Sequence, residues 1–129
     1  MRSIYDRFDA SKCSFHKSMK RTASALLRLM PEVIKWPSTQ AQINDTCSRF
    51  GERSQFQTII GAIDGCHIAI NVPRHSPYSY FDRKRFYSVV LLASCKANTE
   101  FNYVWTGNPG STHDATVLRS SDLFQQSNE

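Results

Sequence analysis

Apolar residues along the chain follow a helical period before residue 56 and a strand period after it. Within residues 11–30 (SKCSFHKSMKRTASALLRLM), one apolar stripe has spacings of three and four and comprises Phe15, Met19, Thr22 or Ala23, Leu26 and Met30. This pattern predicts a helix that Ser11 or Ser14 caps and that Pro31 ends. A shorter helix is expected over residues 38–50, with Ser38 as its cap and Gly51 at its end.

The second half of the chain carries the pattern of β-strands. "TIIGAID" (58–64) is a continuous apolar run ended by an acid, which is typical of a strand buried on both faces, and "HIAINV" (67–72) alternates until Pro73. "FYSVVLLASCK" (86–96) and the alternating "EFNYVWT" (100–106) flank a turn at 97–99 and predict a hairpin. After the breaker "GNPGS", residues 111–124 predict a helix capped by Ser111 or Thr112, with Val117, Leu118 and Phe124 facing inward.

This order of elements predicts an α/β (α+β) fold in which helices precede an antiparallel three-strand meander and a last helix covers one face of the sheet. The other face and the sheet edge remain open in this arrangement, so we expect the sequence to be cut short relative to a complete domain. A length of 129 residues allows one domain, or one domain with an appendage. The sequence has no 18-residue apolar run that could cross a bilayer, and its N-terminus lacks the pattern of a secretory signal.

Charge narrows the class of partner. Sixteen Lys and Arg against eleven Asp and Glu give a net charge of +5, which favours polyanions. Basic and aromatic residues are interleaved in the segment 74–87, called the basic loop below; they are Arg74, His75, Tyr78, Tyr80, Phe81, Arg83, Lys84, Arg85, Phe86 and Tyr87. Such a mixture suits a loop that faces nucleic acid, and an ordinary solvated surface loop fits it equally well. The four cysteines have no CxxC spacing and are expected to be reduced and mostly buried.

Two carboxylates stand where the predicted strands leave the sheet. Asp64 ends the first strand, which we expect to be central, and Asp114 begins the last helix directly after the third strand. If the first and third strands are neighbours, both carboxylates lie near one end of the sheet, where they suit Mg²⁺ or Mn²⁺. A metal there could activate water and stabilise the leaving oxygen of a phosphodiester.

Each of these residues also has a plain structural interpretation. An Asp-Gly pair such as the one at Asp64 is common in turns, and Asp114 is placed to stabilise the start of a helix. His67 and His113 fit hydrogen-bonded structural residues better than ligands or bases. Asp82 fits a charge that balances its basic neighbours. The local pattern therefore favours turn and cap roles over a metal site.

Three segments together resemble the DDE endonuclease domain of the PIF/Harbinger transposase-derived nuclease family. "GAIDGCHIAI" is similar to the GAIDGTH-like first strand of that family, "FDRKRFYS" to its N/D-RKxxYS motif and "PGSTHDATVLRSS" to its PGSxHDxxVLRxS motif. Beginning at "IKWP", they occur in the family's order over about residues 34–124. In addition, "FDASKCSFHKSMKRTASALL" (8–27) resembles the end of the helix-turn-helix segment that precedes the nuclease domain.

The resemblance implies a partial RNase H-like fold, with a helix-turn-helix remnant at 1–55 and the N-terminal part of the nuclease domain at 56–129. It implies metal-dependent cleavage of DNA, with Asp64 and Asp114 as catalytic residues and ligands of Mg²⁺ or Mn²⁺. Arg83 and Lys84 match the family's RK pair, so the basic loop, with Arg74 and Arg85, is the candidate DNA-binding element. The family's role further implies a nuclear location, with DNA and a separate Myb-like DNA-binding protein as partners. No membrane is expected as a partner, because the sequence has no 18-residue apolar run.

The family has two further acids, one in a GDxxY-type strand and a Glu on a later helix. Both would lie beyond Glu129, the last residue of this sequence. With only half of the carboxylates, we expect weak metal binding and little or no activity from this chain alone. Three hypotheses follow: a truncated metal-dependent DNA endonuclease or transposase domain, a non-catalytic DNA- or protein-binding relic, and a degraded domain in which Asp64 and Asp114 are only turn and cap residues. The family motifs favour the first.

Overall fold

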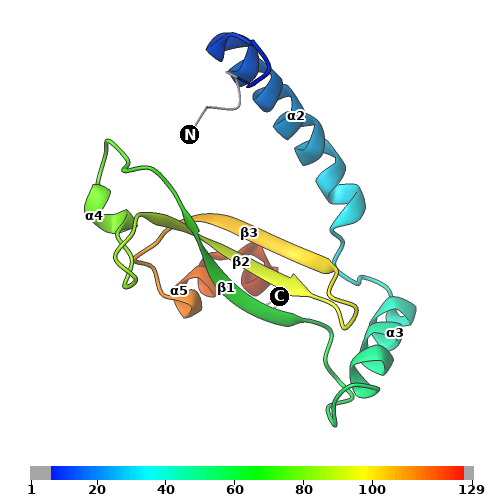
Figure 1. Cartoon of the computed structure of the whole chain (residues 1–129). Coiled ribbons are helices and arrows are strands. Elements are labelled where there is room, and N and C mark those ends of the chain that lie inside the picture. The colour runs from blue at the N-terminus through cyan, green and yellow to red at the C-terminus, as the bar shows by residue number, and fades with distance from the viewer. Residues whose placement is uncertain (1–6, 127–129) are drawn as a thin grey trace. The chain divides into compact units, whose positions relative to one another are not determined.

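A computed structural model describes residues 7–126, which form two compact units, one ending at Ile34 and one beginning at Lys35. The first unit contains helix α2 (Lys12–Val33), drawn in blue and cyan in Figure 1. Ser11, one of the two expected caps, caps this helix: its Oγ accepts a hydrogen bond from the Ser14 N–H at 3.1 Å. The expected stop at Pro31 is wrong, because Pro31 lies within the last turn and the helix continues to Val33.

Helix α3 (Gln40–Gly51) opens the second unit and begins one residue later than expected. Its cap is Thr39 and not Ser38, because Thr39 and Gln42 form a reciprocal capping box. The Gln42 side chain accepts hydrogen bonds from the N–H groups of both Ser38 and Thr39, which leaves Ser38 outside the helix.

The proposed division into segments 1–55 and 56–129 concerns the family's domain layout and stays a prediction.

The second unit is built on a three-stranded antiparallel sheet in the order β1-β2-β3, as the predicted meander requires (Figure 1). Its strands are β1 (Ala62–Ala69), β2 (Ser88–Cys95) and β3 (Phe101–Pro109). The short helix α4 (Pro77–Tyr80) lies between β1 and β2, and a turn at 97–99 joins β2 to β3 as expected. The mixed helix-and-strand fold class is thus confirmed.

Strand β1 corrects two expectations about the first apolar run. It joins the end of "TIIGAID" to the start of "HIAINV" in one strand, so Asp64 lies inside the strand and not at its end. Within the described residues β1 is an edge of the sheet, and β2 separates it from β3. The first and third strands are therefore not neighbours, and β1 is exposed at Ile63 and Asp64 instead of buried on both faces.

The core lies on one face of the sheet. Alternate residues of β2 are buried there, and Val90 and Leu92 form a cluster with Val117 of helix α5 (Asp114–Ser120). Helix α6 (Asp122–Gln126) joins the same face through a hydrogen bond from the Tyr103 hydroxyl to Asp122.

The single helix expected over 111–124 is in fact two short helices. Ser121 separates α5 from α6 and is extended, and its Oγ donates to the Leu118 carbonyl. His113 takes the cap position expected for Ser111 or Thr112, and its side chain makes no capping hydrogen bond.

Two other expectations concern cysteines and membranes. Cys13 and Cys66 are exposed, and Cys47 and Cys95 are partly exposed, so the expected burial is wrong, although none of the four forms a disulfide. Among the helices described, none has the length and apolar character needed to cross a membrane.

Candidate functional site

Asp114, the first residue of α5, reaches the middle of β1. A Cβ atom placed on Gly65 would lie 2.7 Å from the carboxyl carbon of Asp114, so the carboxylate occupies the space that a side chain at position 65 would fill. This close approach requires glycine, because any larger residue would push the carboxylate away. The sheet therefore holds Asp114 beside the residue that follows Asp64.

Asp64 lies on the other face of β1. Neighbouring residues of a strand point to opposite faces, and Asp64 pairs with Ala93 whereas Gly65 pairs with the core residue Leu92. The Asp64 Oδ1 accepts a hydrogen bond from the Gly65 N–H at 2.9 Å, so the carboxylate bends toward the same glycine.

The two predicted catalytic acids thus flank Gly65 from opposite faces of β1. The distances to its N–H and to its Cβ position, combined with standard backbone geometry, keep the Asp64 Oδ1 within about 8 Å of the Asp114 carboxyl carbon. One or two carboxylates can bind Mg²⁺ or Mn²⁺ together with water and phosphate, so Asp64 and Asp114 are each candidate ligands on their own face of the strand. No group of three or more His, Cys, Asp or Glu able to hold a metal occurs among residues 7–126.

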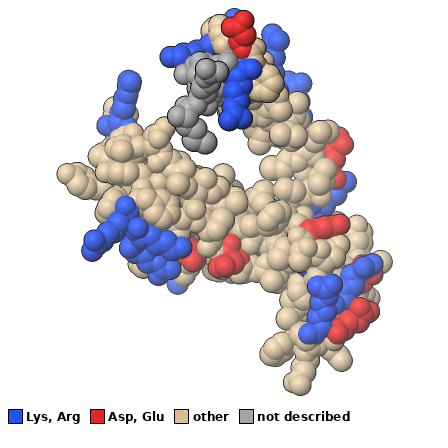
Figure 2. All heavy atoms as spheres, viewed as in Figure 1, with Lys and Arg blue, Asp and Glu red and all other residues tan. Residues whose placement is uncertain are grey.

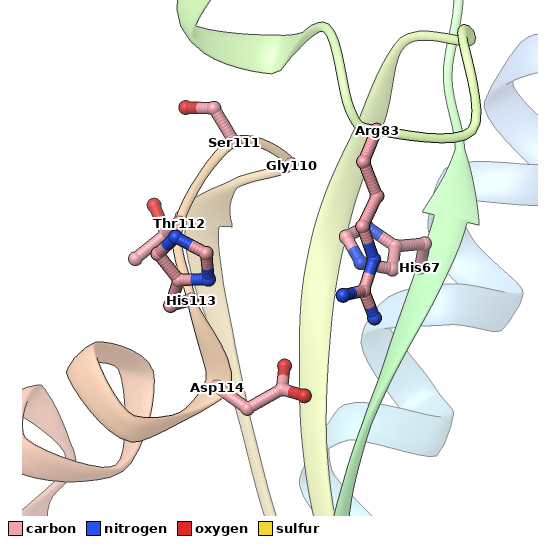
Figure 3. Close-up of a pocket in the computed structure, with 7 residues that line it drawn as sticks. All are labelled: His67, Arg83, Gly110, Ser111, Thr112, His113 and Asp114. Atoms are coloured by element: carbon pink, nitrogen blue, oxygen red, sulfur yellow. The ribbon is translucent and has the colours of Figure 1, made fainter.

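A pocket opens beside Asp114 on the core face (Figure 3). It lies between the end of β1, the basic loop and the segment that leads into α5, and is lined by His67, Arg83, Gly110, Ser111, Thr112, His113 and Asp114. Figure 3 shows the Arg83 guanidinium and the Asp114 carboxylate pointing into this space from different segments. The pocket brings together one predicted catalytic acid and one predicted DNA-binding cation.

The buried Asp82 organises the tip of the basic loop. Its Oδ1 accepts hydrogen bonds from the N–H groups of Lys84 (2.8 Å) and Phe86 (3.2 Å). The Arg85 N–H donates to the Asp82 carbonyl, and Arg85 has φ = 66°, so a tight turn followed by a left-handed residue reverses the chain. Asp82 therefore accepts the backbone hydrogen bonds of the turn. This corrects the expectation that it balances the charge of the neighbouring basic side chains.

Asp82 also orients His67. The Ser88 Oγ donates to Asp82 Oδ2 at 2.9 Å, and the His67 Nδ1 lies 3.0 Å from Ser88 Oγ and 3.5 Å from Asp82 Oδ2. Since Ser88 gives its proton to Asp82, this network assigns a proton to Nδ1 and leaves Nε2 on the opposite side of the ring. His67 is hydrogen-bonded, as its structural interpretation requires, and it also lines the pocket.

Opposing effects set the pKa of Asp82. Burial alone would raise the pKa of this carboxyl, but hydrogen bonds from Phe86, Ser88 and Lys84, together with nearby His67, hold the pKa below its usual value. Asp82 is therefore charged at neutral pH.

The four predicted DNA-binding residues are exposed on the second unit. Arg83, Lys84 and Arg85 occupy the turn that Asp82 organises, and Arg74 belongs to the segment between β1 and α4. Figure 2 shows Lys and Arg gathered at the end of the sheet near α4. The structure thus groups three of the four and places Arg83 in the pocket.

Comparison with known proteins decides the family. The model of the family described as DDE superfamily endonuclease matches residues 63–129, a stretch that includes both predicted acids and the basic loop. The chain belongs to the DDE superfamily endonucleases.

Relatives of this DDE family member cover most of the chain. It is 30% identical over 121 residues to the HARBI1 protein of Rattus norvegicus and 28% identical over 121 residues to that of Homo sapiens, both of which are named as nucleases. Each alignment covers 94% of this chain and 35% of the relative. The protein named ALP1-like of Arabidopsis thaliana is 31% identical over 94 residues, which are 71% of this chain and 22% of that protein. No solved structure matches the chain.

The chain therefore spans about a third of the length of the HARBI1 proteins. The resemblance to the Harbinger-derived nucleases is confirmed by these matches.

Sequence reasoning missed the joint role of Asp82, Ser88 and His67. These residues lie in three segments, and only the pairing of β1 with β2 brings them together. The one available signal was an Asp two residues before a Lys in a short loop, a spacing typical of a side-chain-stabilised turn.

Proposed function

We propose that this chain is the N-terminal part of a metal-dependent DNA endonuclease of the transposase type, with an RNase H-like fold and phosphodiester bonds as substrate. The observation that carries the proposal is the position of Asp114 against Gly65, the residue that follows Asp64, in a DDE superfamily endonuclease. DDE superfamily endonucleases generally depend on divalent metal ions. Asp64 and Asp114 would hold Mg²⁺ or Mn²⁺, which would supply the charge needed to activate water and to stabilise the leaving oxygen.

The chain's own residues would position the DNA. Arg83, Lys84 and Arg85 present three cations on a turn whose backbone is fixed by Asp82, so they are placed to neutralise phosphates. Arg83 also points into the pocket that holds Asp114, which connects the DNA-binding loop to the proposed metal site (Figure 3). We further propose that the complete protein acts in the nucleus with a separate Myb-like DNA-binding partner.

The experiment is a plasmid-nicking assay with Mn²⁺ on the chain and on Asp64→Asn, Asp114→Asn and the matched control Asp45→Asn, a surface acid of α3. Metal-dependent nicking that both site variants lose and Asp45→Asn keeps would support the proposal. Nicking that survives both site substitutions would refute the assignment of the acids. Absence of nicking by all four proteins would refute catalysis by this chain.

A second function, a non-catalytic DNA-binding module, is favoured by the absence of a three-residue metal cluster from the described part of the chain. The basic loop is the proposed DNA-binding element in both functions. Retention of DNA that weakens with salt, without nicking, would support this function, and absence of both would leave the structural interpretation of Asp64 and Asp114.

A further inference from the structure

We propose that helix α2 pairs with α2 of a second copy of this chain, as a two-stranded antiparallel coiled coil centred on Ser24. The contact surface, called the α2 seam below, consists of Phe15, Met19, Thr22, Leu26, Leu29 and Val33. This inference goes beyond the proposed function, because it concerns the first unit and needs neither acid of the candidate site.

The apolar side chains of α2 are left exposed. None of the 22 residues of the helix is buried, and four members of the seam are exposed large apolar side chains. Helices in proteins owe most of their stability to the packing of an amphipathic face, and a continuous apolar stripe exposed to water marks an interaction surface. The seam extends about 27 Å along the helix, so its partner must offer an apolar surface of similar length.

The spacing of the seam indicates that this partner is another helix. Successive members are separated by four, three, four, three and four residues, so every second member lies seven residues further along. A seven-residue repeat keeps an apolar stripe facing one partner helix when the two helices supercoil. The cations Lys17, Lys20, Arg21 and Arg28 occupy positions of the repeat that face away from the seam, so their charges stay in water.

The order of the side chains makes the seam complementary to itself. Its members form three pairs placed equally far before and after Ser24: Thr22 and Leu26, Met19 and Leu29, and Phe15 and Val33. When two copies run antiparallel with Ser24 at the same level, the members of each pair meet across the interface. Two of the pairs combine a larger with a smaller side chain, which suits interlocking packing. Both copies use the same surface, so a two-fold axis closes the pair.

The charges of α2 favour the antiparallel orientation. The first half of the helix carries Lys12, Lys17, Lys20 and Arg21, and its one acid, Glu32, lies in the last turn. A parallel pair would bring the two basic halves side by side, where like charges repel. An antiparallel pair places each basic half beside Glu32 and beside the negative end of the dipole of the other helix.

The first test is the mass of the 129-residue chain, measured by sedimentation equilibrium in a reducing buffer. We expect the mass to rise from that of the 14.7 kDa monomer to that of a dimer between about 1 and about 100 μM. A chain that stays monomeric over this range, or that forms larger species without a dimer, would overturn the proposal. Plasmid nicking tests the proposed function separately, because either result of that assay leaves the mass of the chain unaffected.

Two neighbouring leucines show whether the seam forms the dimer. Leu26 and Leu27 are 62% and 65% exposed, and only Leu26 belongs to the seam. Leu26→Ala should weaken the dimer at least about tenfold, because a seam contact is lost in both copies, whereas Leu27→Ala should change Kd less than about twofold. Equal effects would show a general apolar attraction and refute the seam.

A gain of affinity excludes loss of folding as the explanation. Thr22 is the polar member of the seam, so Thr22→Leu should tighten the dimer about tenfold by adding apolar contact in both copies. The control Ser24→Leu places the same side chain on the side of the helix away from the seam and should leave Kd unchanged. Failure of Thr22→Leu to tighten the dimer, or equal tightening by both variants, would contradict the proposed packing.

Chemical cross-linking tests the orientation. Ser18 and Ala25 border the same side of the seam, one seven-residue repeat apart. In the antiparallel pair the two copies of Ala25 lie opposite each other, whereas the two copies of Ser18 are about 21 Å apart along the axis. A short bismaleimide should therefore link two copies of Ala25→Cys through the new thiols and should not link two copies of Ser18→Cys. Peptide mapping distinguishes these links from links through native cysteines, and equal linkage of both variants would indicate a parallel pair and overturn the proposal.

Discussion

Gly65 is the residue on which the position of Asp114 depends. A Cβ at this position would lie 2.7 and 3.2 Å from the Asp114 Cγ and Oδ2, which belong to a rotatable side chain and not to backbone. We predict that Gly65→Ala moves the carboxylate, changes stability by less than about 1 kcal/mol and reduces the rise in Tm that Mn²⁺ produces. Thermal unfolding with and without Mn²⁺ measures both effects.

A matched glycine shows the contrasting behaviour. A Cβ on Gly110 would lie 2.8 and 2.9 Å from the carbonyl oxygens of Ser88 and Tyr80, so Gly110→Ala should destabilise the chain even without metal. An unchanged Mn²⁺ effect in Gly65→Ala would show that Asp114 does not bind the ion.

A single residue, Asp82, makes the stability of the fold depend on pH. Its pKa is lower in the folded chain than in the unfolded chain, where it has its ordinary value. The hydrogen-bonded carboxylate therefore stabilises the fold above the ordinary pKa, and this stabilisation is lost as the pH falls through the folded-state pKa. We predict that Asp82→Asn has a smaller loss of stability on acidification than wild type, measured by urea unfolding across that acidic range. Parallel curves for the two proteins would contradict this role.

At the scale of elements, α5 packs on the sheet through the buried Val117, with the partly buried Leu118 beside the same cluster. Val117 is completely buried and contacts the cluster of Val90 and Leu92. Val117→Ala should lower the free energy of unfolding by about 1–3 kcal/mol through lost apolar contact and a small cavity. The adjacent Thr116→Ala, on the exposed side of the same helix, should stay within about 0.5 kcal/mol of wild type. Chemical unfolding of both variants checks the pair, and equal losses would mean that α5 is not anchored through Val117.

The elements also show how far the sequence predicts this fold. The hairpin of β2 and β3 was predictable because its alternation and its turn are local features of about twenty residues. The ends of helices were less so, because they depend on competition between neighbouring side chains: Gln42 selects Thr39 over Ser38, and Ser121 breaks the last helix.

The candidate site depended on pairing between distant segments. Both acids were found from motifs, but their placement on opposite faces of β1 follows from the register of β1 with β2, which a local pattern does not specify. The pocket required β1, the basic loop and the start of α5 to meet, so no single stretch of sequence contained it.

At the scale of the whole chain, two units carry basic surfaces, and DNA could be held by either. The second unit has Arg83, Lys84 and Arg85 on the turn of the basic loop, and α2 of the first unit has Lys20, Arg21 and Arg28 around one hollow of its surface. Each Lys or Arg that neutralises a DNA phosphate adds about 0.9 to the slope of log K against log salt concentration. Comparing the salt slopes of variants in each unit therefore identifies the unit that contacts DNA.

We predict that replacing Arg83, Lys84 and Arg85 together with Gln reduces this slope by about 2 to 3, because three phosphate contacts are lost. The matched triple substitution of Lys20, Arg21 and Arg28 should leave the slope close to wild type. Filter binding of a duplex at several salt concentrations, in EDTA so that cleavage does not interfere, gives the three slopes. If the α2 variant loses the slope and the loop variant keeps it, DNA binding belongs to the first unit and the basic loop is an ordinary solvated surface. Since both variants keep Asp64 and Asp114, a changed slope separates DNA retention from any metal-dependent chemistry.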